Sequence, residues 1–204
     1  MAQHPIELTQ AEFCRLARGD RVVPGKGPAD VGLFLLGMRS AAGAACRDVH
    51  RSTPAQARSR LNRACAQSLF NGGNAASFAR NLLQCLDRYI EFDGIAGPAA
   101  LLPGKSKPIP FGAGDIVKAR PDVVLGPSTN GAYEVRVLLF DDLPLTNDSA
   151  ELIALPAVEF VRAEMGATAD RVLVWQLSLQ QEEAVSAAQA QGRKADVTAL
   201  LAGV

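Results

Sequence analysis

The chain has 204 residues, of which 48% are hydrophobic and 21% are charged. This length suffices for one sizeable domain or two small ones, and the composition excludes a disordered, collagen-like or disulfide-stapled chain. Basic and acidic residues number 21 each, so the net charge does not indicate a polyanionic partner. Because aromatic residues make up only 5%, we expect an aliphatic core that is rich in helix.

The N-terminus and the cysteines indicate the compartment. No basic segment followed by an apolar stretch begins the chain, and the longest apolar run, residues 31–38, is far shorter than the roughly 20 residues that span a bilayer. The four cysteines are Cys14, Cys46, Cys65 and Cys85. They lack C-x-x-C spacing, which favours buried thiols in a cytoplasmic protein over a catalytic pair of cysteine and His50.

The first half of the chain has the pattern of four helices. Thr9 and Glu12 have the spacing of a capping box and predict a helix that ends at Gly19. Asp30 predicts the cap of a second, strongly apolar helix, which reaches about Val49.

The third helix has the clearest start signal. Thr53, Pro54 and Gln56 supply a cap, a proline at the first helical position and a capping-box partner, and this helix is expected to reach Phe70. Asn74 predicts the cap of a fourth helix, whose apolar residues recur at spacings of three and four until about residue 91.

Residue 93 marks a change of pattern. Residues 93–114 contain five glycines and four prolines, which predict a loop between a helical region, residues 1–92, and an α/β core, residues 115–204. Within the core, residues 116–125 and 132–141 are rich in Val and Leu and predict the two strands of a hairpin.

The remaining expected elements are a helix from Asp148 to about Glu164, a buried strand over residues 171–179, a helix over residues 180–191 and a final turn over residues 196–201. Together the elements predict an α+β (α/β) fold in which a helical N-terminal half packs on a small mixed sheet. A single compact domain is the preferred interpretation. A four-helix bundle tethered to an independent α/β domain is the alternative.

Charge is divided unevenly along the chain. Residues 1–93 carry 12 basic and 8 acidic side chains, whereas residues 94–204 carry 9 and 13. Residues 39–80 contain seven arginines and a single acid. A guanidinium matches the geometry of a phosphate, which makes these helices a candidate nucleic-acid-binding face. The alternative is a solvated face that pairs with the acidic C-terminal half. The candidate phosphate-binding residues are Arg58, Arg60, Arg63 and Arg120.

The expected hairpin carries the residues with the clearest chemistry. In a regular ladder, Asp122 would lie opposite Glu134 on one face. Two neighbouring carboxylates repel each other unless a cation lies between them, and Mg²⁺ or Mn²⁺ binds to such oxygen ligands. The candidate metal ligands are therefore Asp122, Glu134 and the backbone carbonyl of Val135.

Pro121 and Asp122, followed twelve residues after the aspartate by the triplet Glu134, Val135 and Arg136, resemble the signature of the PD-(D/E)xK nuclease superfamily. The resemblance covers roughly residues 75–180, because the expected order of helix, hairpin, helix and strand is that of its restriction-endonuclease-like core. It implies that Asp122 and Glu134 hold the metal. Arg136 stands where the family has lysine, and an arginine can steady a phosphate but cannot act as a base at neutral pH.

Two functions follow for this hairpin. The first is a metal-dependent nuclease-like protein that acts on or binds nucleic-acid phosphodiesters, with Asp122, Glu134 and Arg136 as catalytic residues. The alternative is a catalytically inactive module of the same fold, whose partner is a nucleic acid, another protein or a second copy of the chain. In a purely structural interpretation, Asp122 pairs diagonally with Arg136, and Arg120 pairs with Glu134, at ~0.2–1 kcal/mol each.

Overall fold

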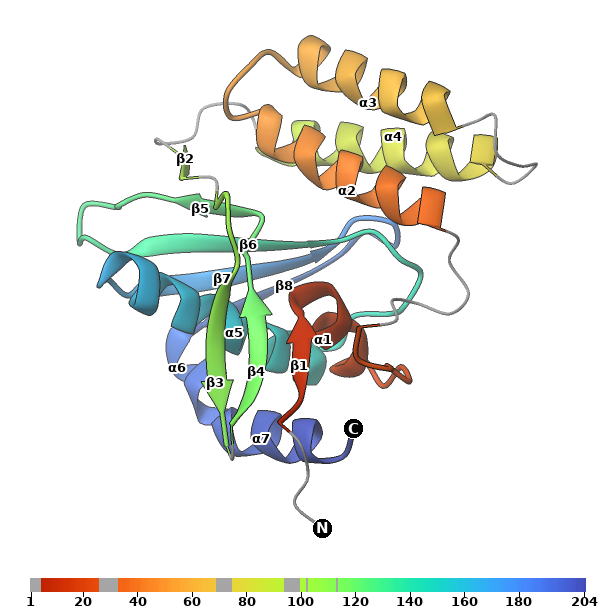
Figure 1. The fold of residues 1–204 in the computed structure, drawn as a ribbon. Helices are drawn as coiled ribbons and strands as arrows, with labels where there is room; N and C mark the ends of the chain where they lie inside the picture. Colours follow the sequence, from red (N-terminus) through yellow and green to blue (C-terminus); the bar gives the residue numbers. More distant parts are fainter. Residues whose placement is uncertain (1–4, 26–32, 69–74, 94–99, 102, 113) are drawn as a thin grey trace.

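The computed structural model describes residues 5–25, 33–68, 75–93, 100–101, 103–112 and 114–204. Within these residues the chain forms seven helices and eight strands. Helices cover the faces of mixed sheets (Figure 1), which confirms the expected α+β class with N-terminal helices packed on a sheet.

The helices are α1 (Gln10–Leu16), α2 (Leu33–Asp48), α3 (Pro54–Ser68), α4 (Ala75–Asp93), α5 (Asn147–Met165), α6 (Ala187–Gly192) and α7 (Lys194–Ala202). The strands are β1 (Glu7–Thr9), β2 (Ala100–Leu101), β3 (Lys107–Phe111), β4 (Asp115–Ala119), β5 (Val123–Leu125), β6 (Tyr133–Leu139), β7 (Ala169–Gln176) and β8 (Gln181–Ser186).

The described strands form two mixed sheets. The larger sheet has the order β2-β5-β6-β7-β8, in which β6 and β7 are parallel and the other neighbours are antiparallel. α5 provides the crossover between β6 and β7 that a parallel pair requires. The smaller sheet has the order β1-β4-β3, with β1 parallel and β3 antiparallel to β4.

Two hydrophobic clusters lie on opposite faces of the larger sheet. On one face, valines of β6 and β7 pack with α5, in a cluster that also contains α1 and the smaller sheet. On the other face, Leu138 and Trp175 pack with buried side chains of α2, α3 and α4. Successive side chains of a strand point to opposite faces, so β6 contributes to both clusters. The larger sheet therefore lies between α2–α4 and α5 (Figure 1).

The cap signals of α1 and α3 are confirmed. At α1, the Glu12 N–H donates to Thr9 Oγ1 at 3.3 Å, and the Glu12 carboxylate accepts from the Thr9 N–H at 2.8 Å. At α3, the Gln56 N–H donates to Thr53 Oγ1 at 3.3 Å, and Gln56 Oε1 accepts from the Thr53 N–H at 3.1 Å. Pro54 is the first helical residue, where its missing N–H leaves no bond unmade.

α5 confirms the helix expected from Asp148 to about Glu164, to within one residue at each end. Its cap is Thr146, whose hydroxyl accepts from the Ser149 N–H at 3.2 Å. Pro156 lies inside the helix, as expected.

The helix expected over residues 180–191 is wrong in its first half. β8 occupies residues 181–186 and pairs antiparallel with β7, so that Val185 lies opposite Val172 and is buried. α6 begins only at Ala187, after a cap at Ser186. Gln, Glu and Ala have helical preferences, but the free edge of β7 offers a full ladder of hydrogen bonds, and tertiary pairing overrides the local preference.

The loop expected over residues 93–114 contains strands β2 and β3. β3 forms an edge of the smaller sheet although it contains Pro108 and Pro110. An edge strand tolerates proline because the missing N–H can face outward, away from the ladder. The short strand β1, over residues 7–9, had no sequence signal of its own and pairs with β4.

The first strand of the expected hairpin is in fact two strands. β4 belongs to the smaller sheet and β5 to the larger one, and between them the chain leaves regular structure at residues 120–122, with Pro121 followed by a bend at Asp122. Proline cannot donate to a ladder, which makes this a natural point for the chain to leave one sheet and enter another. The bend places Asp122 where the two sheets meet.

The expected helix caps Asp30 and Asn74 lie outside the described residues. All four cysteines are buried and free, as expected. The single compact domain stays a prediction, which the packing of Leu138 and Trp175 against α2–α4 supports. In the described part of the chain, the apolar length needed to cross a membrane is not reached by any helix.

Candidate functional site

Asp122 turns its carboxylate from the bend between β4 and β5 toward α2 and β6. Its Oδ1 accepts a hydrogen bond from Arg47 Nη1 at 3.2 Å, and its Oδ2 accepts one from the backbone N–H of Leu138 at 2.9 Å. Gly43 of α2 lies close by, and a Cβ at that position would be in ordinary van der Waals contact with Asp122 Oδ1, at 3.5 Å. Both carboxylate oxygens are therefore engaged by donors from neighbouring elements.

Burial raises the pKa of Asp122 from 3.8 to about 6. The Leu138 N–H and the Arg47 guanidinium act in the opposite direction because each stabilises the ionised form, but desolvation outweighs them. A carboxyl group with a raised pKa is typical both of functional sites and of buried ion-pair networks. The bonds of Asp122 to Arg47 and to the Leu138 N–H are those of a buried ion-pair network.

Glu134 is held by two arginines. Arg136 Nε and Nη2 each donate to Glu134 Oε1 at 3.0 Å, and Arg171 Nε donates to Oε2 at 2.7 Å. The two arginine side chains differ in exposure, at 7% for Arg136 and 55% for Arg171. The charge of this carboxylate is therefore neutralised within the protein.

Arg136 connects the larger sheet with the N-terminal helices. Its Nη1 donates to Tyr89 Oη of α4 at 3.2 Å, and Tyr89 Oη lies 2.6 Å from His50 Nε2. The fully buried Tyr89 ring also packs beside Trp175 of β7, with ring centres 5.6 Å apart. A lysine has a single ammonium and could not bond Glu134 through two nitrogens while it reaches Tyr89 with a third. The geometry thus gives a structural reason for arginine at this position.

The expected pairing of Asp122 with Glu134 is wrong. In the observed ladder, Leu125 lies opposite Glu134 and Val123 lies opposite Arg136. Each residue of β5 therefore pairs three positions further along β6 than expected. Glu134 and Arg136 do share one face of β6, but Asp122 lies level with the far end of that strand.

The diagonal charge lattice is also wrong, because both of its acids have other partners. Asp122 is bonded to Arg47 rather than to Arg136, and Glu134 is bonded to Arg136 and Arg171 rather than to Arg120. An odd displacement of a ladder exchanges the residues on its two faces, so one error in register changes every expected partner.

The turn between β5 and β6 explains the displacement. The Ser128 N–H donates to the Ala132 carbonyl at 2.8 Å, and Asn130 Oδ1 accepts from the Ala132 N–H at 3.1 Å. These bonds centre the turn near Asn130 rather than near Ser128. The position of a turn within a polar loop sets the register of both strands.

The residues expected to bind Mg²⁺ or Mn²⁺ do not fit such an ion in this arrangement. The oxygens of Asp122 and Glu134 are bonded to donors of the protein itself. Val135 is paired with Val124 on one side and Val172 on the other, so its carbonyl belongs to the sheet. Across the described ranges, no group of three His, Cys, Asp or Glu side chains is arranged to hold a metal ion.

The arginines expected to bind phosphate lie in two places. Arg58, Arg60 and Arg63 all lie on α3 and are exposed. Arg120 follows β4, where its backbone N–H donates to Gln10 Oε1 of α1 at 2.6 Å. The structure thus brings three of the four arginines onto one helix and places Arg120 beside another.

The ion pairs of α2–α4 are mostly local. Arg58 pairs with Asp87 of α4, and Arg60 pairs with Asp48 of α2 at 2.5 Å. Within the described residues, no ion pair is formed by the exposed side chains of Arg51, Arg63 and Arg80. Of the seven arginines in residues 39–80, only Arg47 forms a described ion pair with an acid of the C-terminal half. Broad pairing of this face with that half is therefore not observed.

The sequence alone did not identify three residues of the site as functional candidates. Arg47 was one of a run of arginines, Tyr89 was one position of an apolar stripe, and Arg171 marked the start of an expected strand. No local signal distinguishes them, because each acquires its partner from an element that is distant in the sequence. No protein-family model matches the chain, and no curated protein matches it at a significant level.

Proposed function

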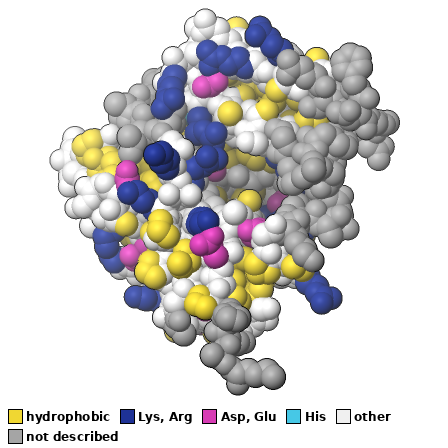
Figure 2. Space-filling model, viewed as in Figure 1, with side chains coloured by type: hydrophobic (Ala, Val, Ile, Leu, Met, Phe, Trp, Pro, Cys, Tyr) yellow, Lys and Arg dark blue, Asp and Glu magenta, His cyan; other side chains and the backbone are white. Residues whose placement is uncertain are grey.

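We propose that the protein binds the phosphate backbone of nucleic acids through exposed arginines of α3, α4 and the turn between α2 and α3, and does not hydrolyse it. The observation that carries the proposal is that Arg51, Arg63 and Arg80 are exposed and form no ion pair within the described residues. On the face shown in Figure 2, Lys and Arg side chains gather over the helices at the top of the view. A guanidinium that is free of internal partners is available to a phosphate.

The fold supports a nuclease-like ancestry for such a module. The succession of α4, a strand pair β5–β6, α5 and β7 follows the order that the resemblance to the PD-(D/E)xK superfamily implies, with β2, β3 and β4 inserted between α4 and β5. The engaged carboxylates favour the inactive form over the hydrolase, since Glu134 bonds two arginines and Asp122 bonds Arg47. Hydrolysis through these residues requires both carboxylates to leave their partners.

Fluorescence anisotropy with a labelled oligonucleotide tests the binding. The double variant Arg51→Ala/Arg63→Ala removes two charges from the proposed surface, and we expect the slope of log K against log salt to become shallower by ~1.4 for a single strand. The matched control is Arg162→Ala/Lys194→Ala, which removes two exposed charges from α5 and α7. Equal slopes for the wild type and both double variants would contradict the proposal.

A second experiment tests the absence of hydrolysis. We expect no cleavage of labelled single- or double-stranded DNA in Mg²⁺ or Mn²⁺, and no calorimetric heat of Mn²⁺ binding that depends on Glu134. The comparison is between the wild type and Glu134→Ala. Cleavage that is lost in Glu134→Ala, together with a lost heat of binding, would establish the metal-dependent nuclease instead.

A further inference from the structure

A groove of about 490 Å³ lies between α3 and α4. It is lined by Pro54, Ala55, Arg58, Ser59, Asn62 and Ile90. Its volume falls within the range of small-molecule sites. A volume of this size is large enough for about one nucleotide unit. The groove lies on α3 and α4, which also carry the exposed Arg63 and Arg80, and it is not lined by Asp122 or Glu134.

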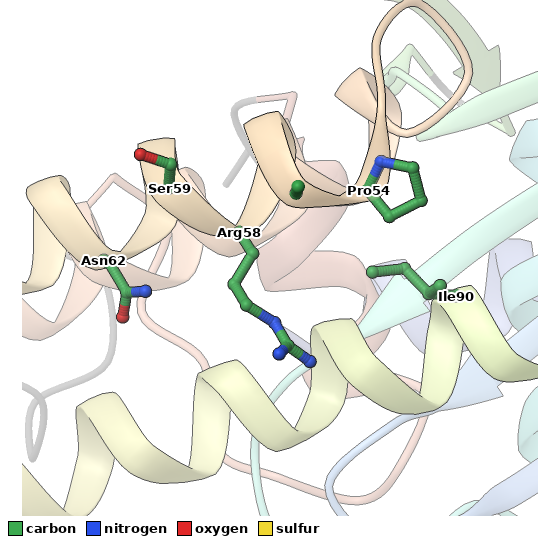
Figure 3. A pocket seen from close by; sticks show the side chains of 6 residues that line it. Pro54, Arg58, Ser59, Asn62 and Ile90 are labelled. Atoms are coloured by element: carbon green, nitrogen blue, oxygen red, sulfur yellow. The ribbon is translucent and has the colours of Figure 1, made fainter.

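Arg58 is the cationic group of this groove. Figure 3 shows its side chain extending from α3 toward α4, where it forms an ion pair with Asp87. The pair is exposed, with 53% of the Arg58 side chain and 35% of the Asp87 side chain accessible. Exposed ion pairs are weak because water and salt screen them, so an incoming anion can replace Asp87 at little cost.

The other lining residues indicate the rest of the ligand. The Asn62 amide is a neutral donor on the same helix and points toward α4, as Arg58 does (Figure 3). Among the described residues that line the groove none is acidic, and the nearest carboxylate is Asp87, the partner of Arg58. Pro54 and Ile90 form an apolar end, as Figure 3 shows. An anion beside a neutral donor, followed by an apolar contact, matches a phosphate with its attached sugar and base.

We propose that this groove binds a phosphate and the adjoining nucleoside of a single-stranded nucleic acid, with the phosphate on Arg58 in place of Asp87. The inference rests on the proposed function and adds a site and a strand preference to it. Only an unpaired strand can place a base against Pro54 and Ile90, because a duplex keeps its bases stacked inside. Along the chain, the exposed Arg51 precedes and the exposed Arg63 follows the lining residues of α3.

The test compares two variants of the ion pair by anisotropy, with a fluorescein-labelled oligothymidylate of about 12 nucleotides and a duplex of the same length. Arg58→Ala should weaken binding of the single strand about tenfold, because a charge-assisted hydrogen bond to phosphate is lost. Asp87→Asn should strengthen it about threefold, because the competing carboxylate is removed. Misfolding cannot produce such a gain in affinity.

Arg162→Ala is the matched control, since Arg162 is 55% exposed and, like Arg58, pairs with an acid of the described residues, Glu159. It should bind the single strand as the wild type does. The groove is excluded if Arg58→Ala matches this control or if Asp87→Asn binds no more tightly. If Arg51→Ala/Arg63→Ala is weakened while Arg58→Ala is not, the proposed function stands without the groove. If the wild type binds neither oligonucleotide, both proposals fail. If Arg58→Ala weakens binding of the duplex as much as binding of the single strand, the preference for a single strand is overturned.

Discussion

Glu134 offers a direct comparison between a buried and an exposed arginine, since Arg136 and Arg171 bond the same carboxylate. Arg136→Ala should lower the free energy of unfolding by about 2–3 kcal/mol, because it removes the buried partner of Glu134 and a donor to the buried Tyr89 hydroxyl. Arg171→Ala should cost only about 0–1 kcal/mol. Arg136→Lys should recover part of the loss. Urea denaturation measures all three, and equal losses for the two alanine variants would contradict a connecting role for Arg136.

The raised pKa of Asp122 predicts an unusual pH dependence of stability. The folded protein keeps the proton of Asp122 up to about pH 6, whereas the unfolded chain loses it near pH 3.8. Between these values the folded state binds more protons, so the contribution of Asp122 to the free energy of unfolding falls as the pH rises and is constant above that window. Asp122→Asn lacks this titration. We expect its stability relative to the wild type to increase by up to about 3 kcal/mol from pH 4 to pH 7.

Asp141 is the control for this pH dependence. Burial alone would raise the pKa of Asp141, but the hydrogen bonds and charge of Arg18 hold it below its usual value. Its stabilising contribution is therefore present above pH 3.8 and is lost as the pH falls further. Asp141→Asn should show no increase in relative stability between pH 4 and pH 7. If the difference in stability between Asp122→Asn and the wild type stays constant from pH 4 to pH 7, burial does not raise the pKa of Asp122.

At the scale of elements, the turn between β3 and β4 is packed against α7. Gly112 in this turn has φ +50°, and a Cβ there would lie 2.5 Å from Cγ2 of Thr198 on α7. Gly131, in the turn before β6, has φ +78° with no atom within 4 Å of a Cβ. Gly131→Ala should therefore cost only the left-handed backbone penalty of about 1–2 kcal/mol. Gly112→Ala should cost about 1–2 kcal/mol more because it also overpacks the turn.

Thr198→Ala separates the two costs at Gly112. In a Thr198→Ala background, Gly112→Ala should cost about as much as Gly131→Ala, because the Cγ2 atom is then absent. Thermal or urea unfolding of the single and double variants gives the interaction energy of the pair. An unchanged cost in that background would show that α7 does not restrict this turn.

At the scale of the whole molecule, the larger sheet packs on α2–α4. This packing predicts that the helices and the sheet unfold as one cooperative unit. Trp175 is the single tryptophan of the chain and lies in the same cluster as Leu138 and the buried side chains of α2–α4. If the helices and the sheet unfold together, Trp175 fluorescence and far-UV circular dichroism should give coincident urea transitions. Leu138→Ala should shift both transitions equally, by about 2–4 kcal/mol. Separate transitions would favour a helical bundle that folds independently of the α/β core.

Local chemistry determined much of this fold. The capping boxes at Thr9 and Thr53 could be read from the sequence because their bonds join residues three positions apart. The apolar runs of β6 and β7 and the length of α5 were also predictable, since a buried strand and an amphipathic helix have distinct periods. The shared face of Glu134 and Arg136 followed from the alternation of side chains along a strand.

Long-range pairing decided the rest. β8 and β3 form strands because a neighbouring edge offers hydrogen bonds that outweigh the helical preference of one segment and the prolines of the other. The register of β5 on β6 depends on the position of the turn within the polar loop that joins them. The alternation of apolar residues in the strands does not predict that position. The partners of Asp122 and Glu134 come from elements up to 75 residues away. The sequence by itself determined that Glu134 and Arg136 share one strand face, because side chains alternate along a strand. Only the tertiary structure decided which arginines pair with Asp122 and Glu134, because Arg47 and Arg171 come from elements distant in the sequence.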